Sequence, residues 1–140
     1  MFILDTNAIS DLLKDHPKIL TRLRAVPRER RVATSIITRI EILEGRFASI
    51  TKAANRTELL NAAVRLFNDE QHLSTIDILP VTEAVADEFE RLRINKKLKQ
   101  IGQKDRLIAC FALAHDATLV TRNTKDFANI PGLKVENWAD

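Results

Sequence analysis

Four acidic residues in this 140-residue sequence lie where carboxylates could hold a metal ion. They are Asp5, Glu41, Asp105 and Asp126. Carboxylates gathered at one place repel one another, and this repulsion raises their pKa values or requires a cation. Hard divalent cations such as Mg²⁺ or Mn²⁺ prefer oxygen ligands of this kind. The four acids therefore predict a Mg²⁺ or Mn²⁺ site if the fold brings them together.

Each acid also has an ordinary structural explanation, and for three of them it is a helix cap, a first-turn charge or a turn. Asp5 follows the apolar residues 2–4 and could cap the helix after them, with Thr6 as an alternative cap. Asp105 in a first helical turn would favour the helix dipole by about 0.3–1 kcal/mol. Asp126 could cap a helix or close a turn that Phe127 anchors. Each alternative stays open for one acid alone, whereas convergence of separate segments favours a shared site.

Glu41 lies within the amphipathic stretch SIITRIEILEG. Its ordinary explanation is a solvated side chain paired with Arg39 or Arg46. Gly45 follows one turn later, although glycine inside a helix costs about 1 kcal/mol relative to alanine. We therefore expect something to approach the backbone closely at Gly45. Glu44 is expected at the surface.

Other catalytic chemistries find little support. His16, His72 and His115 are scattered without metal-ligand spacing, which argues against a zinc site. No serine or cysteine is paired with a histidine in a recognisable nucleophile motif. Cys110 is the only cysteine, so it has no intrachain disulfide partner.

The composition is that of an ordinary globular domain, with 45% hydrophobic and 29% charged residues. No apolar run approaches the roughly 20 residues of a membrane span, and no basic stretch precedes the short apolar start. With the lone cysteine, this predicts a cytoplasmic protein with no membrane association. Setting aside the four acids leaves 22 basic against 15 acidic residues, or +7. That excess suits a polyanionic ligand, although a solvated, slightly basic surface explains it equally well.

Short strands alternate with helices, which predicts an α/β fold with a parallel sheet covered on both faces. The expected strands are 2–5, 31–34, 76–81, 118–121 and 133–136. The expected helices are 6–14, 18–25, 36–48, 55–72, 82–97 and 104–115. Ligands bind such sheets beyond the carboxyl ends of the strands. Asp5 ends the first strand, and Asn123 and Asp126 closely follow the fourth.

Four stretches together resemble the PIN-domain ribonucleases, above all the VapC- and FitB-type toxins of bacterial toxin–antitoxin pairs. They are ILDTNAISDLL, IEILEG, IGQKDRLIACFALAH and LVTRNTKDFANIPGLKVENW. Their order and spacings follow the family's. The resemblance covers essentially the whole chain, so it implies one PIN domain over residues 1–140. The implied fold is a three-layer α/β/α sandwich with a central parallel sheet.

The resemblance also implies particular site residues. The family's acidic quartet falls on Asp5, Glu41, Asp105 and Asp126. Thr121 and Asn123 match polar positions that line the same pocket. Thr6 and Asn7 match the residues that position the loop of the first acid. Two departures lie outside the quartet: Asp116, where family members often have glycine, and Glu44, where they often have an apolar or aromatic residue.

The function implied by the resemblance is that of a metal-dependent endoribonuclease. Asp5 and Asp105 would be the main ligands of Mg²⁺ or Mn²⁺, with Glu41 and Asp126 binding directly or through water. The metal would activate a water for in-line attack on an RNA phosphodiester bond. The implied partners are a VapB- or FitA-like antitoxin and a second copy of the chain in a homodimer. DNA would be contacted only through the antitoxin, and residues 36–66 are candidates for both protein contacts.

Several basic residues flank the acidic motifs and could contact phosphates, although ordinary surface charge is the alternative. They are Arg39, Arg46, Lys104, Arg106 and Arg122. Two rival functions remain. A haloacid-dehalogenase-type phosphatase would need a second aspartate two residues after the first, where this chain has Asn7. A non-catalytic PIN-like module that binds RNA or protein would need no cleavage, and the presence of all four acids argues against it.

Overall fold

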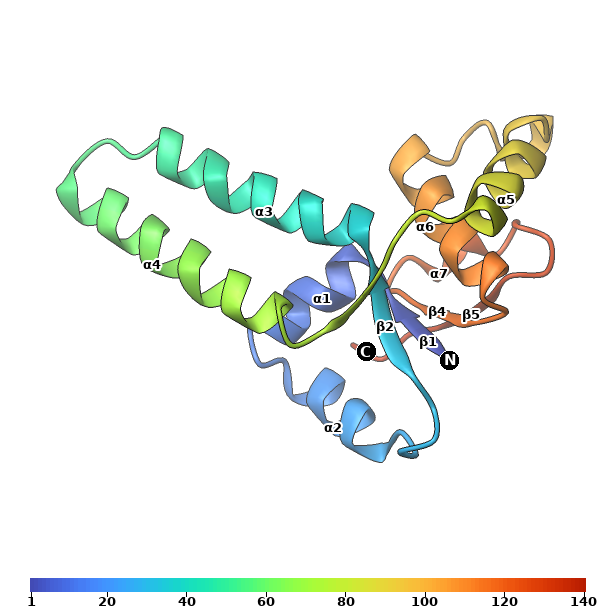
Figure 1. Ribbon diagram of the computed structural model, residues 1–140, viewed down its shortest axis with the longest axis horizontal. Coiled ribbons are helices and arrows are strands. Elements are labelled where there is room, and N and C mark those ends of the chain that lie inside the picture. The colour runs from blue at the N-terminus through green and yellow to red at the C-terminus, as the bar shows by residue number, and fades with distance from the viewer.

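The computed structural model describes residues 1–140 and contains a five-stranded, entirely parallel sheet (Figure 1). The strands lie in the order β3-β2-β1-β4-β5. They are β1 (Phe2–Leu4), β2 (Val32–Ser35), β3 (Asp77–Leu79), β4 (Thr118–Val120) and β5 (Lys134–Glu136). The predicted α/β class with a central parallel sheet is confirmed. The third strand is shorter than the predicted 76–81 and ends before Pro80, which has no N–H to donate to a neighbouring strand.

Helices connect and cover the strands. They are α1 (Thr6–Leu13), α2 (Pro17–Ala25), α3 (Ile36–Thr51), α4 (Arg56–Leu73), α5 (Glu83–Arg93), α6 (Gln103–Ala114) and α7 (Thr124–Phe127), with a 3₁₀ turn η1 (Lys96–Leu98). Helices α3 and α4 form a long hairpin that projects from the sheet (Figure 1). No helix is long and apolar enough to cross a membrane.

One predicted helix is too long, and one short helix was missed. The helix predicted over 82–97 ends at Arg93, and Asn95 then caps η1 by accepting a hydrogen bond from the Lys97 N–H at 3.0 Å. The chain turns there because Leu98 must enter the core, where its side chain is fully buried. The short helix α7 was not predicted at all, since four residues show no clear periodicity.

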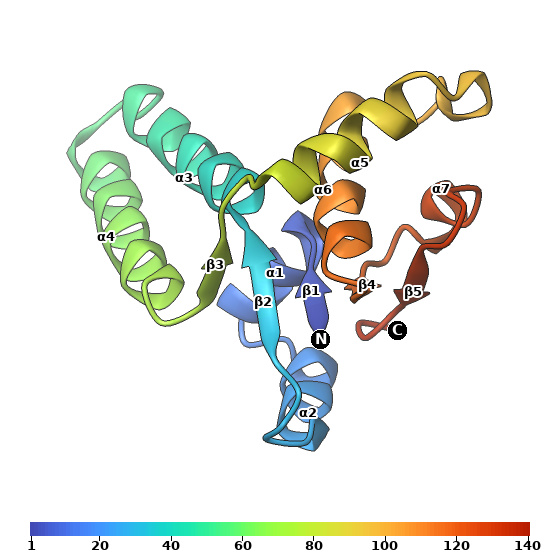
Figure 2. The ribbon, with the colours of Figure 1, turned by 45° about the vertical axis from the view of Figure 1, so that its right-hand side comes forward.

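Alternating side chains of β1 divide the core into two layers. Ile3 faces a cluster that includes Phe111 of α6 and Leu92 of α5. Phe2 and Leu4 face the opposite cluster, which contains residues of α1 and α2. Because successive residues of a strand point to opposite faces, three residues of β1 contribute to both layers. The α/β/α sandwich follows from this arrangement (Figure 2).

The strand register brings two candidate residues to the same edge of the sheet. Leu4 pairs with Val120 in the parallel β1–β4 ladder. The next residues, Asp5 and Thr121, are therefore neighbours just beyond the carboxyl ends of these strands. The Asp5 N–H donates to the Val120 carbonyl at 3.0 Å, which fixes this alignment.

Candidate active site

Asp5 both caps a helix and faces the other candidate acids. Its side chain is buried, and Oδ1 accepts a hydrogen bond from the Ala8 N–H at 2.8 Å. Burial raises the pKa of Asp5, while the Thr121 hydroxyl and the Ala8 N–H act against this by favouring the charged form. The nearby charges of Asp105 and Asp11 raise the pKa further. The capping explanation is therefore correct, and it does not exclude a site at the same carboxylate.

Asp105 connects the acids electrostatically. It lies in the first turn of α6 and is half-buried, with no ion pair of its own. Burial is the largest cause of its raised pKa, followed by the charges of Glu41 and Asp126. The charge of Asp105 in turn raises the pKa of Asp5. Asp105 therefore interacts electrostatically with each of the other three predicted acids. The fold thus brings the four segments to one edge of the sheet.

Glu41 is oriented by residues of two other helices. The Thr6 hydroxyl donates to Glu41 Oε1 at 2.9 Å, and Lys104 Nζ lies 3.7 Å from Glu41 Oε2. The alternative explanation, a pairing with Arg39 or Arg46, is not what the structure shows, because Arg46 pairs with Asp69 of α4.

The close approach expected at Gly45 is not made by this chain. A Cβ atom at that position would meet no atom within 4 Å. Glu44 is exposed, as expected. The backbone around Gly45 is therefore accessible from outside the helix.

The predicted polar residues after β4 form a connected group. The Asn123 side chain donates from Nδ2 to Asp126 Oδ2 at 2.7 Å, and the Asn123 N–H donates to the Thr121 hydroxyl at 2.9 Å. Thr121 is fully buried, whereas Asp126 is exposed at the first turn of α7. Phe127 is buried and anchors this turn, as predicted. The Asn123 amide thus holds the Asp126 carboxylate on the side of the acids.

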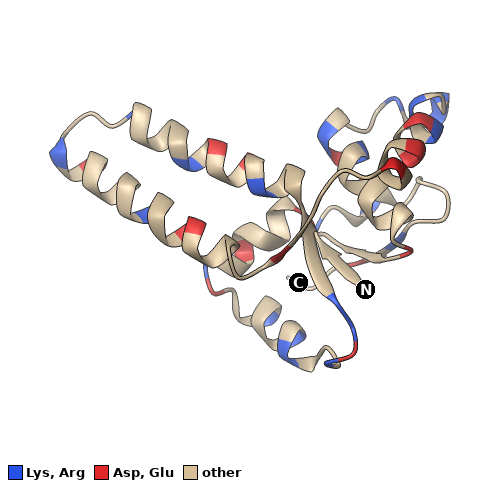
Figure 3. Cartoon of the chain, in the orientation of Figure 1, with Lys and Arg blue, Asp and Glu red and all other residues tan.

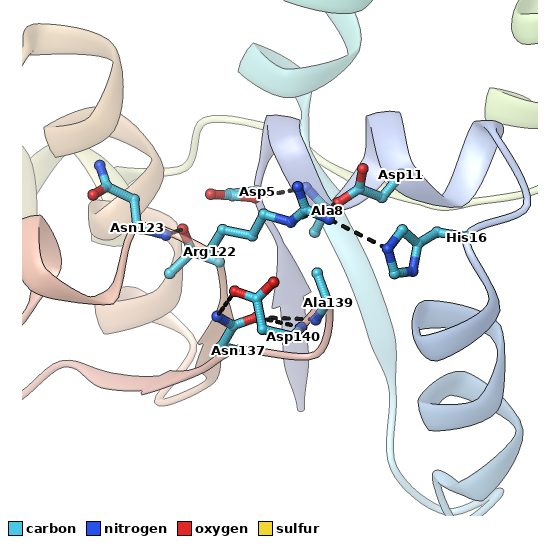
Figure 4. A network of polar contacts seen from close by, with 10 residues as sticks. Asp5, Ala8, Asp11, His16, Arg122, Asn123, Asn137, Ala139 and Asp140 are labelled. Carbon is cyan, nitrogen blue, oxygen red and sulfur yellow. Dashed lines mark hydrogen bonds and ion pairs between the residues drawn. The ribbon is translucent and has the colours of Figure 1, made fainter.

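Sequence reasoning missed a contact group beside Asp5 (Figure 4). Arg122 Nε lies 3.2 Å from Asp11 Oδ2, and its Nη2 lies 3.3 Å from His16 Nε2. Asp11 had no motif to single it out, although its charge raises the pKa of Asp5. The two partners of Arg122 lie more than 100 positions away in the sequence, so only the folded chain shows that they meet.

The chain as a whole is similar to a known protein family. The chain matches the family described as "PIN domain" over residues 2–133. It belongs to the PIN-domain family.

Full-length relatives within the PIN-domain family are also similar to this chain. "Ribonuclease VapC2" of Rickettsia felis is 31% identical over 141 residues, covering 99% of this chain and 98% of the relative. "Ribonuclease VapC1" of Haemophilus influenzae strain R2866 is 30% identical over the same shares. The resemblance to VapC-type PIN-domain ribonucleases predicted from the sequence is confirmed.

Solved structures give the same result. VapBC-1 from nontypeable Haemophilus influenzae matches with a TM-score of 0.79 at 27% identity, covering 99% of this chain and 98% of that one. VapBC2 from Rickettsia felis, bound to a DNA fragment from its promoter, matches at 0.76 and 30% identity over 98% of both chains. A toxin–antitoxin complex from Klebsiella pneumoniae matches at 0.70 and 28% identity, covering 98% and 97%.

The donor chemistry of this PIN-domain site fits a hard divalent cation. The predicted ligands are carboxylates only. Burial is the largest cause of the raised pKa values of Asp5 and Asp105, and repulsion from neighbouring carboxylates raises both further. A cation would relieve this repulsion. No three His, Cys, Asp or Glu side chains converge on one point as the structure stands. Binding would therefore require the carboxylates to turn toward a common centre.

Proposed function

We propose that this protein is a metal-dependent endoribonuclease and the toxin of a VapBC-like toxin–antitoxin pair. The observation that carries the proposal is the proximity of the acids at the carboxyl edge of the sheet, where the charge of Asp105 raises the pKa of buried Asp5 and the charges of Glu41 and Asp126 raise that of partly buried Asp105. The ribonuclease names of full-length relatives support the reaction class. We also propose that residues 1–140 form a single PIN domain.

Asp5 and Asp105 are the proposed main ligands of Mg²⁺ or Mn²⁺, and Glu41 and Asp126 complete the site directly or through water. When bound, the ion would lower the pKa of a water and offset negative charge that develops on the phosphate. Burial leaves the Asp5 carboxylate partly dehydrated, and the hydrogen bond from the Ala8 N–H orients it. The charged form of this side chain is stabilised by the Thr121 hydroxyl and the Ala8 N–H, so both help it to act as a ligand.

Neighbouring side chains position the two outer acids. Thr6 holds Glu41 through a hydroxyl hydrogen bond, and Asn123 holds Asp126 through its amide. Partners of this kind fix the orientation of metal-binding side chains. The lone thiol is no alternative nucleophile, because Cys110 is fully buried and burial raises its pKa to about 11.

The form of the site suits a polymer. None of the hollows in the surface includes any of the four acids, and Asp126 lies exposed at the edge of the sheet. An open edge admits a long RNA chain from either side. A small-molecule enzyme would more often enclose its substrate.

The proposed partners are RNA as substrate, a VapB- or FitA-like antitoxin, and a second copy of the chain. The similar structures of VapBC and toxin–antitoxin complexes support the antitoxin, and the one of VapBC2 bound to a promoter DNA fragment supports contact with DNA through it. The α3–α4 hairpin offers exposed apolar side chains for protein contacts within the predicted segment 36–66 and just beyond it. They are Ile40, Phe47, Leu59, Leu60, Val64 and Phe67. We propose that the protein acts in the cytoplasm, where its RNA substrate lies.

The experiment that tests this proposal is cleavage of total cellular RNA by the purified, antitoxin-free protein. It is run with Mg²⁺ or Mn²⁺, with chelator, and with Asp5→Asn. Asp87→Asn is the matched control, since Asp87 is exposed on α5 and forms no ion pair. Discrete fragments that require both the metal and Asp5 are expected. Intact RNA with folded, metal-bound protein would instead favour the non-catalytic binding module.

A further inference from the structure

The segment that joins α5 to α6 carries an unusual concentration of positive charge. Residues 91–106 contain seven Lys or Arg side chains and one acid, which is Asp105. The net charge of this segment is therefore +6, whereas the whole chain carries only +3. Figure 3 shows blue Lys and Arg positions at the end of α5 and in the turn that follows, next to red acidic positions on α5 itself. We call residues 95–99 the lysine loop, after Lys96, Lys97 and Lys99.

The lysine loop is held in place by buried anchors. Leu98 is fully buried, and Ile101 just beyond the loop is nearly so. The Leu98 N–H donates to the Asn95 carbonyl at 3.1 Å, and the Ile101 N–H donates to the Leu98 carbonyl at 3.1 Å. With Leu98 pointing inward, Lys97 and Lys99 on either side remain exposed. The loop thus presents its charges from a defined backbone.

The three lysines of the loop have no acidic partner. Neighbouring arginines are neutralised locally, since Arg91 pairs with Glu88 and Arg93 with Glu90. No such ion pair is made by Lys96, Lys97 or Lys99, and all three are exposed. Their positive charge is therefore available to a ligand.

The lysine loop leads directly to the candidate site. It returns the chain from the far end of α5 to the start of α6, where Lys104 lies beside Glu41 and Asp105 occupies the first turn (Figure 2). Leu98 and Ile101 pack in the same core cluster as Ile108 of α6. The loop and the helix that carries Asp105 are therefore packed together.

We propose that Lys96, Lys97 and Lys99 bind the sugar–phosphate backbone of the RNA beyond the phosphodiester that is cut. This inference rests on the proposed ribonuclease function and names a binding surface for its substrate. Lysine ammonium groups act as compact point charges on flexible stems, which suits phosphate contact without reading of base sequence. The loop therefore adds affinity for long RNA, whereas selection of the cut position lies elsewhere.

A second basic segment provides a matched control. Residues 18–31 on α2 and the loop after it contain six Lys or Arg side chains and one acid. This segment precedes β2 and reaches the amino-terminal edge of the sheet, opposite the candidate site (Figure 2). Arg22 and Arg31 are paired with Glu136 and Asp77. Lys18, Arg24 and Arg28 are exposed and unpaired, so they match the loop lysines in number and charge.

The test measures binding of a labelled single-stranded RNA oligonucleotide to the full chain in chelator, where no metal-dependent cleavage can occur. The triple variants are Lys96→Ala/Lys97→Ala/Lys99→Ala and the control Lys18→Ala/Arg24→Ala/Arg28→Ala. Each lost phosphate contact reduces the slope of log K against log salt by about 0.7, so the loop variant should lose about 2. Between about 50 and 200 mM salt, its affinity should then fall roughly 16-fold less than that of the parent. The control should keep the parental slope.

Equal salt slopes for the parent and the loop variant would overturn the proposal. A control variant whose salt slope falls as much as that of the loop variant would overturn it too. A loss in the control alone would also overturn it and move the RNA surface to α2. A Lys→Gln triple variant with a parental unfolding midpoint replaces the alanine variant if that one is misfolded. Because binding is measured without cleavage, the role of the lysine loop in RNA binding can be confirmed even if the protein does not cut RNA. In a protein that does cut, the loop variant should raise KM for long RNA while leaving kcat unchanged.

Discussion

The Thr6 hydroxyl donates a hydrogen bond to Glu41 Oε1 at 2.9 Å and so ties the first turn of α1 to α3 across 35 positions of sequence. Thr6 Oγ1 also lies 3.1 Å from the Thr38 hydroxyl. Thr6 follows Asp5 directly, so one short segment supplies a buried carboxylate and the group that orients a second one. This coupling explains why a threonine follows the first acid.

Thr6→Val should lower kcat about 10- to 100-fold without unfolding the protein, because it removes the donor while nearly keeping the volume. Thr6→Ser keeps a hydroxyl and should retain most of the activity. The measurement is steady-state cleavage of a defined RNA, alongside the thermal unfolding midpoint. Equal activity of the valine variant and the parent would mean that the Glu41 orientation is unimportant.

Asp5→Asn should abolish cleavage and yet stabilise the metal-free protein near neutral pH. Asparagine caps helices about as well as aspartate, so the variant removes the buried charge and keeps the cap. The pKa of Asp5 is raised on folding, so its stabilising contribution is complete below the unfolded value near 3.9 and is lost as pH rises through the folded value.

The measurement for this prediction is the difference in unfolding midpoint between Asp5→Asn and the parent in chelator. That difference should grow in favour of the variant from about pH 4 to pH 7. Asp5→Ala loses the helix cap as well as the charge, so its unfolding midpoint should rise less than that of Asp5→Asn. A constant difference across this range would show that burial of the charge has no energetic consequence.

Mn²⁺ or Mg²⁺ should raise the unfolding midpoint of the parent. An ion at 100 times its dissociation constant stabilises the folded state by about 2.7 kcal/mol. Asp105→Asn should remove most of this shift because Asp105 is a proposed main ligand, and Asp87→Asn should keep it. Thermal scans with added ion or chelator give the result independently of RNA cleavage. An undiminished shift in Asp105→Asn would place the ion elsewhere.

Much of the fold could be predicted because it depends on local patterns. Alternation of short apolar runs with amphipathic helices predicts the parallel sheet, and that sheet places Asp5 and the residues after β4 at one edge. The helix break near Asn95 was missed because it depends on Leu98 reaching the core rather than on a local signal.

The contacts between side chains could not be predicted in the same way. Arg122 could have met any of several acids, and only packing of α1 and α2 against the end of β4 brings it to Asp11 and His16. The partners of Glu41 could not be predicted for the same reason, since Arg46, one of the two alternatives, pairs with Asp69 of α4. Motif spacing thus identified candidate acids but not the residues that orient them.

Asp69→Ala should destabilise the protein by about 3–5 kcal/mol, since it leaves a largely buried arginine without its partner. The side chains of Arg46 and Asp69 are 14% and 9% exposed, and they join α3 to α4. Replacing both, as Arg46→Met/Asp69→Leu, should recover most of the loss by substituting apolar packing. Chemical denaturation of the three proteins measures this. A double variant as unstable as the single one would show that the unpaired charge is not the cause.

Asp116→Gly should stabilise the protein by roughly 1 kcal/mol. Asp116 has a φ of 48°, in the left-handed region that glycine adopts without steric cost. Its side chain is 94% exposed, so the ion pair with Lys134 that the substitution removes contributes little. The left-handed backbone gives a physical reason for the glycine that the family resemblance implies at this position.

The control for this position is Asp116→Ala, which loses the ion pair and keeps the strained backbone. Alanine should therefore be no more stable than aspartate, and it should be less stable than glycine by about 1 kcal/mol or more. The free energy of unfolding from denaturant titration separates the three. Equal stability of the glycine and alanine variants would show that the turn before β4 relaxes to a negative φ, and the strain argument would then fail.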